Sequence, residues 1–487
     1  MSPPEANDER RIAIVGAGIS GLLACKHAIE KGFKPVVFEA RNNVGGVWSN
    51  TIHSTKLQSP KDYFQFSDFP WPESVSETFP DHNQVLDYIT SYARRFDLFR
   101  HINFNSKVVG INYVSSEDTS CWSMWGGSGE PFSARGKWDV VVQDALRAVE
   151  GAKVYQVEFV ILCIGKFSDL PNVPQFPKSK GANVFNGEVI HSMDYAAMDK
   201  VEAEKFIENK RVTVVGFRKS ALDIAAQIAR TNGAKNPCTL LFRRVHWTAS
   251  ENLVRFTFRN MNRFSELMIH RPHQTLILWF LALVLSPLRW MFSKLAEWYL
   301  KWMYPLKEYD MVPDHSLLGQ IRSCMLMVLP QDFYQRVKEG SLVLKKSSEL
   351  GFYEDGLVLA MKCITASSAP FYRECIHPRI PQLAILGHSE SAATLFTFEL
   401  RSKWLAHFLA GGFRLPTVRG MEEDVERWEK NGRRYSLEDY KRACVGVQLQ
   451  IHCNDQLCKD MGCNPRRKKW FFPELFSPYH PADYADL

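Results

Sequence analysis

Arg11-Ile-Ala-Ile-Val15 runs directly into Gly16-Ala17-Gly18-Ile19-Ser20-Gly21 and then into a helical Leu22-Leu-Ala-Cys-Lys-His-Ala28. This order of residue types predicts a buried strand, a tight turn and a helix. Gly16 allows the turn, Gly18 lets the backbone approach a pyrophosphate, and Gly21 lets the helix pack closely on the strand. The helix N-terminus offers free N–H groups and a partial positive charge. We therefore predict a dinucleotide site at residues 16–21.

A second predicted strand, Pro35-Val-Val-Phe-Glu39, ends in a carboxylate about 20 residues beyond the glycines. Glu39 would bond a ribose 2′-hydroxyl and repel a 2′-phosphate, which favours FAD or NAD over NADP in this site. The alternative is an ordinary helix cap with an unrelated surface glutamate. The loop that follows contains Gly45-Gly46-Val47-Trp48, in which paired glycines let the backbone approach a ligand. By themselves these glycines are also compatible with a plain turn.

An altered copy of the first motif begins at Arg211-Val-Thr-Val-Val215 and continues as Gly216-Phe217-Arg218-Lys219-Ser220-Ala221. Arg218 stands where glycine normally permits close approach, so its Cβ would push a pyrophosphate outward while its guanidinium could bind the phosphates. Ala221 is an accepted replacement for the last glycine. The next strand ends in Arg243-Arg244, and cations at that place suit a 2′-phosphate. We predict that this second site binds NADPH; a solvated basic strand end is the alternative.

The segment between the two turns carries a family resemblance. Phe185-Asn-Gly187-Glu-Val-Ile-His191-Ser-Met-Asp-Tyr195 matches F-x-G-x-x-x-H-x-x-x-[FYW] and resembles the N-hydroxylating and flavin-containing classes of flavin-dependent monooxygenase. Baeyer-Villiger relatives usually end this motif in Trp followed by Pro or Asp, whereas this chain has Tyr195-Ala196. The resemblance extends over nearly the whole chain and is strongest to the plant flavin-containing monooxygenases. Further matching segments are residues 54–62, 66–72 and 395–404.

The resemblance implies an α/β, two-dinucleotide-binding (Rossmann-like) flavoprotein, an FAD domain with an inserted NADPH domain. Its expected parts are the first part of the FAD domain (1–205), the NADPH domain (206–345) with an apolar helical insertion near 264–303, the return to the FAD domain (346–414), and a C-terminal helical tail (415–487). FAD would lie in the first site, with the 45–48 loop over its pyrophosphate, and NADPH in the second.

The chemistry that the resemblance implies begins with hydride transfer from NADPH to FAD. Reduced flavin and O₂ then form a flavin hydroperoxide, which oxygenates a nitrogen or sulfur atom of a small amine, imino acid or thioether. Within the plant group, a cyclic imino acid such as pipecolate is a reasonable candidate for N-hydroxylation. His191 is expected to be architectural.

Two departures from the family pattern leave alternatives open. Gln58 replaces an active-site Asn that many relatives carry just before x-P-K, so Gln58 is the candidate catalytic residue, or else a plain loop residue before Pro60. Residues 357–369 are shorter than the strand and following segment that relatives have there. Either 357–365 substitutes as a shortened strand, or FAD binding is impaired. An uncoupled NADPH oxidase and a non-catalytic pseudoenzyme are therefore the alternative functions.

Composition restricts the remaining possibilities. The 487 residues carry a net charge of +7, modest for this length, and no basic run with interleaved aromatics predicts nucleic-acid binding. Eleven cysteines form no C-x-x-C pair, which argues against a disulfide reductase of the same fold, and no metal site is expected. The polar N-terminus lacks the hydrophobic core of a signal peptide. We therefore expect a cytoplasmic protein, with the face of the endoplasmic reticulum as an alternative setting.

One apolar stretch, Thr275 to Leu288, needs separate treatment. Its fourteen uncharged residues fall short of the roughly 20 that span a bilayer, and Pro287 is expected to interrupt the helix. The favoured interpretation is a buried helix. The alternative is peripheral membrane contact through residues 275–293.

Overall fold

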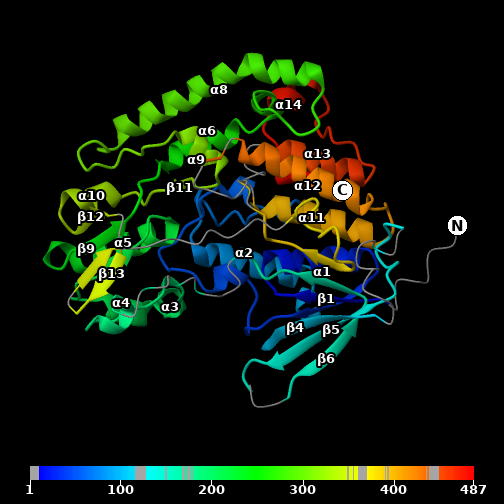
Figure 1. Cartoon of the computed structure of the whole chain (residues 1–487), viewed down its shortest axis with the longest axis horizontal. Coiled ribbons are helices and arrows are strands. Elements are labelled where there is room, and N and C mark those ends of the chain that lie inside the picture. Colours follow the sequence, from blue (N-terminus) through cyan, green and yellow to red (C-terminus); the bar gives the residue numbers. More distant parts are fainter. Residues whose placement is uncertain are drawn as a thin grey trace.

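The computed structural model describes residues 10–115, 125, 128–147, 151–166, 171, 173, 176, 179–347, 350–354, 356–359, 370–389, 391, 394–434, 436–437 and 449–487. Two parallel sheets, each with helices against it, form the body of the molecule (Figure 1). This arrangement confirms the predicted α/β class with two nucleotide-binding folds.

The first sheet has the strand order β15-β7-β1-β2-β3, with all neighbours parallel. Its strands are β1 (Arg11–Val15), β2 (Lys34–Phe38), β3 (Ile102–Asn103), β7 (Phe159–Leu162) and β15 (Leu383–Ile385). The helices α1 (Ile19–Glu30), α2 (His82–Arg95) and α11 (Thr394–Leu409) belong to this unit. A separate antiparallel sheet packs against the first sheet; its strands are β4 (Ser106–Val114), β5 (Lys137–Asp144) and β6 (Lys153–Val157). In this contact Trp138 and Val140 of β5 share an apolar cluster with Ala13 and Phe38.

The second sheet has the parallel order β12-β9-β8. Its strands are β8 (Thr213–Val215), β9 (Cys238–Phe242) and β12 (Leu342–Lys346). Helices α4 (Lys200–Ile207), α5 (Lys219–Asn232) and α10 (Phe333–Lys338) surround it, and a separate apolar core that includes Leu222, Leu240 and Phe333 holds them together. Short elements complete this unit: β10 (Thr248–Ala249), β11 (Met327–Val328), α6 (Glu251–Arg259), α7 (Arg263–Leu267) and α9 (Leu317–Arg322).

The motif at 185–195 lies between the two units in the sequence, and its second half forms the start of a helix. His191 is the N-cap of α3 (Ser192–Ala197), where its Nδ1 accepts from Met193 N at 3.2 Å and Asp194 accepts from His191 N at 3.1 Å. Such a capping box satisfies N–H groups that would otherwise lack partners. These contacts fit an architectural role for His191.

The C-terminal region is helical, with α12 (Val418–Arg433), α13 (Gln450–Asp460) and α14 (Phe471–Phe476). Two of the family segments meet here: Glu399 of α11 accepts from Ser67 N at 2.8 Å, and α11 also packs against α1. Cys324 is disulfide-bonded. A reducing compartment disfavours disulfide bonds, which speaks against the expected cytoplasmic location. That location stays a prediction.

The shortened segment after Asp355 does form a strand, but away from the nucleotide-binding sheets. β14 (Gly356–Leu359) pairs antiparallel with β13 (Leu350–Tyr353) in a two-stranded hairpin. The rest of the segment, residues 360–369, lies outside the described residues. β15 supplies the returning strand of the first sheet by pairing with β7.

The apolar stretch differs from its favoured interpretation in two ways. It belongs to α8 (Leu276–Met303), a 28-residue helix that continues through Pro287. Only 6% of the most apolar 18-residue window of this helix is buried. Proline leaves the carbonyl of Leu283 without its usual helical donor, and the Ser286 hydroxyl donates to that carbonyl at 2.9 Å instead. The expectations of a buried helix and of an interruption at Pro287 are therefore wrong.

Candidate functional site

The first turn needs glycine for steric reasons. Gly16 has φ +102°, and a Cβ placed there would lie 2.6 Å from the carbonyl oxygen of Cys163. Its N–H donates to Phe38 O at 2.8 Å, which ties the turn to the end of β2. A Cβ on Gly21 would lie 1.9 Å from Gly16 O, so α1 can approach the turn only without a side chain there. This is the close approach that the sequence predicted.

The start of α1 forms an open cradle. Gly18 is the N-cap and contributes no side-chain cap, so the first N–H groups of the helix are left for a ligand. A Cβ on Gly18 would lie 3.5 Å from the Cα of Gly46, and a Cβ on Gly46 would lie 3.1 Å from the Cα of Gly18. The Gly45 N–H donates to Ala17 O at 3.1 Å. The 45–48 loop therefore lies against the glycine turn, with a glycine on each side of the contact.

Glu39 organises this cradle. Its carboxylate accepts from Ala17 N at 2.6 Å and from Arg41 N at 3.0 Å. The carboxylate thus lies directly beside the turn, at the place where it could meet a ribose hydroxyl. Because it is negative, the same position disfavours a 2′-phosphate.

The other predicted residues of the first site differ in exposure. Trp48, in the short helix Gly46–Ser49, is half-buried with its ring edge-on to Phe64 at 5.9 Å, whereas Val47 is exposed. Ile19 is half-buried and Ser20 is buried. A Cβ on Gly387 would lie 2.4 Å from Ser20 Oγ, so the turn after β15 closes on the start of α1. Chain segments 367 positions apart therefore meet at the turn.

The second turn repeats the geometry with different side chains. Gly216 has φ +131°, its N–H donates to Leu241 O at 2.8 Å, and exposed Arg218 is the N-cap of α5. Phe217 is buried against Phe242, with ring centroids 4.8 Å apart, and Ser220 is exposed. Ala221 packs close to Gly216, where its methyl lies 3.5 Å from a Cβ placed on the glycine. Lys219 bonds Asp223 at 2.6 Å and so points along the helix.

A basic cavity of about 290 Å³ lies at the end of β9. It is lined by Arg243, Arg244, Val245, Val312, Asp314 and Lys346. The arginines are those predicted for a 2′-phosphate. Lys346 was missed, because it reaches the cavity only through the pairing of β12 with β9, where it is in register with Phe242.

The surroundings of the cavity are electropositive. The pKa of His246 is lowered to about 4, mainly by burial and in smaller part by nearby positive charges, including Arg218 and Arg244. His246 is therefore neutral at physiological pH.

Gln58 lies in a loop of the first nucleotide-binding unit that contacts the second. Its Oε1 accepts from Val328 N of β11 at 3.1 Å. Earlier in the same loop, Thr55 Oγ1 donates to Asp223 of α5 at 3.0 Å, and burial raises the pKa of that carboxyl. The amide nitrogen of Gln58 is the end of the side chain that could donate to a ligand. Its catalytic role stays a prediction.

Two nucleotide-binding turns, one with a carboxylate beside it and one with a basic cavity, are the arrangement expected of an oxidoreductase with two dinucleotide sites. The family described as flavin-binding monooxygenase-like matches residues 9–312, and the chain belongs to this family. The family places it among the flavin-dependent monooxygenases.

Individual relatives agree with this assignment. The probable flavin-containing monooxygenase 1 of Arabidopsis thaliana is 36% identical, covering 97% of this chain and 96% of its own. The solved S-allyl-L-cysteine S-oxygenase from Allium sativum is similar in fold, with TM-score 0.52, 18% identity, and 93% and 89% of the two chains covered. The OTEMO complex with FAD and NADP has TM-score 0.63, 14% identity, and 93% and 98% covered.

Proposed function

We propose that this protein uses NADPH and O₂ to oxygenate a nitrogen or sulfur atom of a small amine, imino acid or thioether. The observation that carries the proposal is the opposite charge of the two cradles, with Glu39 beside the first turn and Arg243 and Arg244 beside the second. This difference supports FAD at the first turn and NADPH at the second. A chain that holds both can combine hydride supply with oxygen activation.

The residues of the chain bind and orient the two dinucleotides. The N–H groups at the start of α1 would hold the FAD pyrophosphate, and Glu39 would accept from the adjoining ribose. Arg218 would contact the NADPH pyrophosphate from the N-cap of α5. When bound, FAD supplies the redox chemistry, taking hydride from NADPH and activating O₂.

Gln58 is suited to position rather than to transfer protons. A carboxamide does not titrate, but its Nε2 can donate a hydrogen bond to an oxygen atom. The bond between Oε1 and Val328 N fixes the orientation of the side chain. Gln58 would thus hold the donor at the junction of the two units.

The substrate class rests on the sequence around Tyr195. The motif ends in Tyr195-Ala196, unlike the Baeyer-Villiger pattern, and this supports attack on nitrogen or sulfur rather than on a ketone. The similarity to a protein described as an S-oxygenase is compatible with a thioether. Within the plant group, a cyclic imino acid is the first nitrogen substrate to test.

The test is product analysis with the purified holoprotein. Flavin content is measured first, and then NADPH, isotopically labelled O₂ and either pipecolate or S-allyl-L-cysteine are added. An N- or S-oxygenated product that carries one labelled oxygen supports the proposal. NADPH consumption that yields only hydrogen peroxide for a broad amine and thioether panel would instead identify the uncoupled oxidase. A protein that cannot be loaded with FAD would identify the non-catalytic alternative.

A further inference from the structure

Two segments nearly 200 residues apart expose large apolar side chains on one part of the surface. Helix α8 exposes them along its length, and residues 470–476, which contain α14, expose four more. We name this set the apolar face: Leu276, Ile277, Trp279, Phe280, Leu281, Leu283, Val284, Trp290, Met291, Phe292, Leu295, Trp298, Trp302, Trp470, Phe471, Phe472 and Phe476. Soluble monomers rarely leave so large a contiguous apolar surface in water, so it indicates an interaction site.

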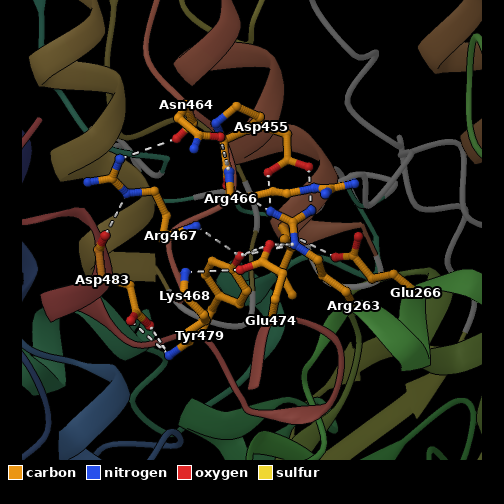
Figure 2. Close-up of polar contacts among 12 residues, drawn as sticks. Arg263, Glu266, Asp455, Asn464, Arg466, Arg467, Lys468, Glu474, Tyr479 and Asp483 are labelled. Atoms are coloured by element: carbon orange, nitrogen blue, oxygen red, sulfur yellow. Dashed lines mark hydrogen bonds and ion pairs between the residues drawn. The ribbon is translucent and has the colours of Figure 1, made fainter. Parts of the chain in front are cut away.

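A buried ionic cluster fixes α14 to α7, the helix that packs against α8. Figure 1 shows α14 beside one end of α8, and α7 contacts both helices. Arg263 of α7 bonds Glu474 of α14 at 2.5 Å and both oxygens of Asp455 in α13 at 2.6 and 2.8 Å (Figure 2). Asn262 Nδ2 also donates to Phe476 O at 2.9 Å. These charged, largely buried contacts fix α14 to α7, and α7 in turn packs against α8.

Helix α8 lies on the protein body rather than leaving it. Ala282 and Leu300 are 18 positions apart, which is five turns, and both are almost fully buried, so one stripe of the helix faces the protein. At its C-terminal end, Glu297 is buried and accepts from Leu317 N at 3.0 Å. Its N-terminal end follows α7, which Arg263 anchors. Both ends of the helix are thus fixed to the same body, which is incompatible with crossing a bilayer.

The charges of the apolar face favour an anionic partner. Within α8 and residues 466–476 the carboxylates are Glu297 and Glu474, and both are buried. The exposed charges of these segments are basic: Lys294, Lys301, Arg466 and Lys469. A second copy of this chain would bring like charges together and offer no exposed carboxylate from these segments. An amphipathic surface with tryptophan and basic residues is instead typical of a helix that lies in a membrane interface.

We propose that the apolar face docks on a lipid bilayer that contains anionic lipids. Helix α8, about 42 Å long at 1.5 Å per residue, lies parallel to the membrane plane. Trp470, Phe471 and Phe472 enter the interface beside one end of the helix. The basic residues at the edge contact the headgroups. The docking surface is composite, because neither segment alone contains the whole face.

The proposal is tested by vesicle flotation of the full-length holoprotein. Vesicles of phosphatidylcholine alone are compared with vesicles that also contain phosphatidylserine. The variants are Phe471→Glu/Phe472→Glu on α14 and Trp279→Glu/Phe280→Glu on α8. The matched control is Val154→Glu on β6, a similarly exposed apolar position at the opposite end of the molecule in Figure 1. Flavin content and thermal unfolding show that each variant is folded.

We expect wild type and Val154→Glu to float with the phosphatidylserine vesicles, and each double variant to lose about tenfold or more in vesicle partitioning. Binding that is unaffected by the α14 substitutions would overturn the composite face, and a wild type that stays with neither vesicle type would overturn membrane docking. A wild type that is dimeric in size-exclusion chromatography and becomes monomeric in the α14 variant, with no vesicle binding, would assign the face to a second copy instead.

Discussion

Replacing Arg244 by alanine is expected to raise the KM for NADPH and to leave the KM for NADH unchanged. Arg244 lines the basic cavity at the end of β9, where a ribose 2′-phosphate would lie. NADH lacks this phosphate and so makes no contact for the substitution to remove. The comparison of the two coenzymes isolates the interaction with the phosphate.

The magnitude follows from the exposure of the residue. A hydrogen bond to a charged group contributes about 1.5–3 kcal/mol, and exposure of Arg244 places it near the lower value. A loss of about 1.4 kcal/mol is a factor of about ten in KM. Removal of Arg243 as well should raise the effect to roughly 100-fold if the two contacts are independent. Asp314→Asn should act in the opposite direction, because it removes a negative charge from the cavity wall.

The assay is the initial rate of NADPH or NADH oxidation at varied coenzyme concentration. Lys345→Ala is the matched control, since Lys345 precedes Lys346 in β12 and points to the opposite face of the strand. Lys346→Ala should resemble Arg244→Ala. An equal rise in KM for NADH, or the same effect from Lys345→Ala, would refute the assignment of this cavity to the 2′-phosphate.

Three further predictions concern other parts of the chain. Gly21→Ala should destabilise the apoprotein, because its Cβ would lie 1.9 Å from a backbone oxygen. Gly18→Ala should instead lower FAD affinity with little change in apoprotein stability, because the Cβ would lie 3.5 Å from Gly46 Cα, an ordinary contact distance. Thermal unfolding and flavin titration measure both effects, and equal melting temperatures for the two apo variants would contradict the steric argument. Gln58→Ala should increase the hydrogen peroxide released per NADPH oxidised while hydride transfer stays near the wild-type rate; an unchanged ratio would restrict Gln58 to joining the two units through Val328. Burial raises the pKa of the Glu266 carboxyl to about 7 from an ordinary 4.5. Between these two pH values the folded protein therefore holds a proton that the unfolded chain has released. The free energy of unfolding should fall by about 3 kcal/mol as pH rises from about 4.5 to about 7. Glu266→Gln should lack this part of the pH dependence in denaturant titrations, and an identical slope in the two proteins would show that the Glu266 carboxyl is not protonated in the folded state.

Local signals predicted the nucleotide turns well because their constraints act over a few residues. The strand Arg11–Val15 and the helix that starts at Ile19 are as expected from the sequence. The positive φ of Gly16 and the clash that a side chain at Gly21 would cause are also local requirements. Such requirements leave a direct trace in the choice of glycine.

Contacts between distant segments could not be predicted in the same way. Lys346 enters the basic cavity through the register of β12 on β9, and Gln58 meets Val328 across 270 positions of sequence. Neither pair has a distinctive spacing or motif. Only the packing of the two units brings these residues together.

The sequence by itself determined the two nucleotide-binding turns and the contrast between Glu39 and the arginines at 243 and 244. The tertiary structure decided the fate of the apolar stretch. Composition shows that α8 is apolar, but exposure depends on what packs against it, and here only one stripe of the helix meets the body. The ionic contacts of Arg263 fix α14 to α7, which packs against α8, and no local pattern in either segment specifies this arrangement.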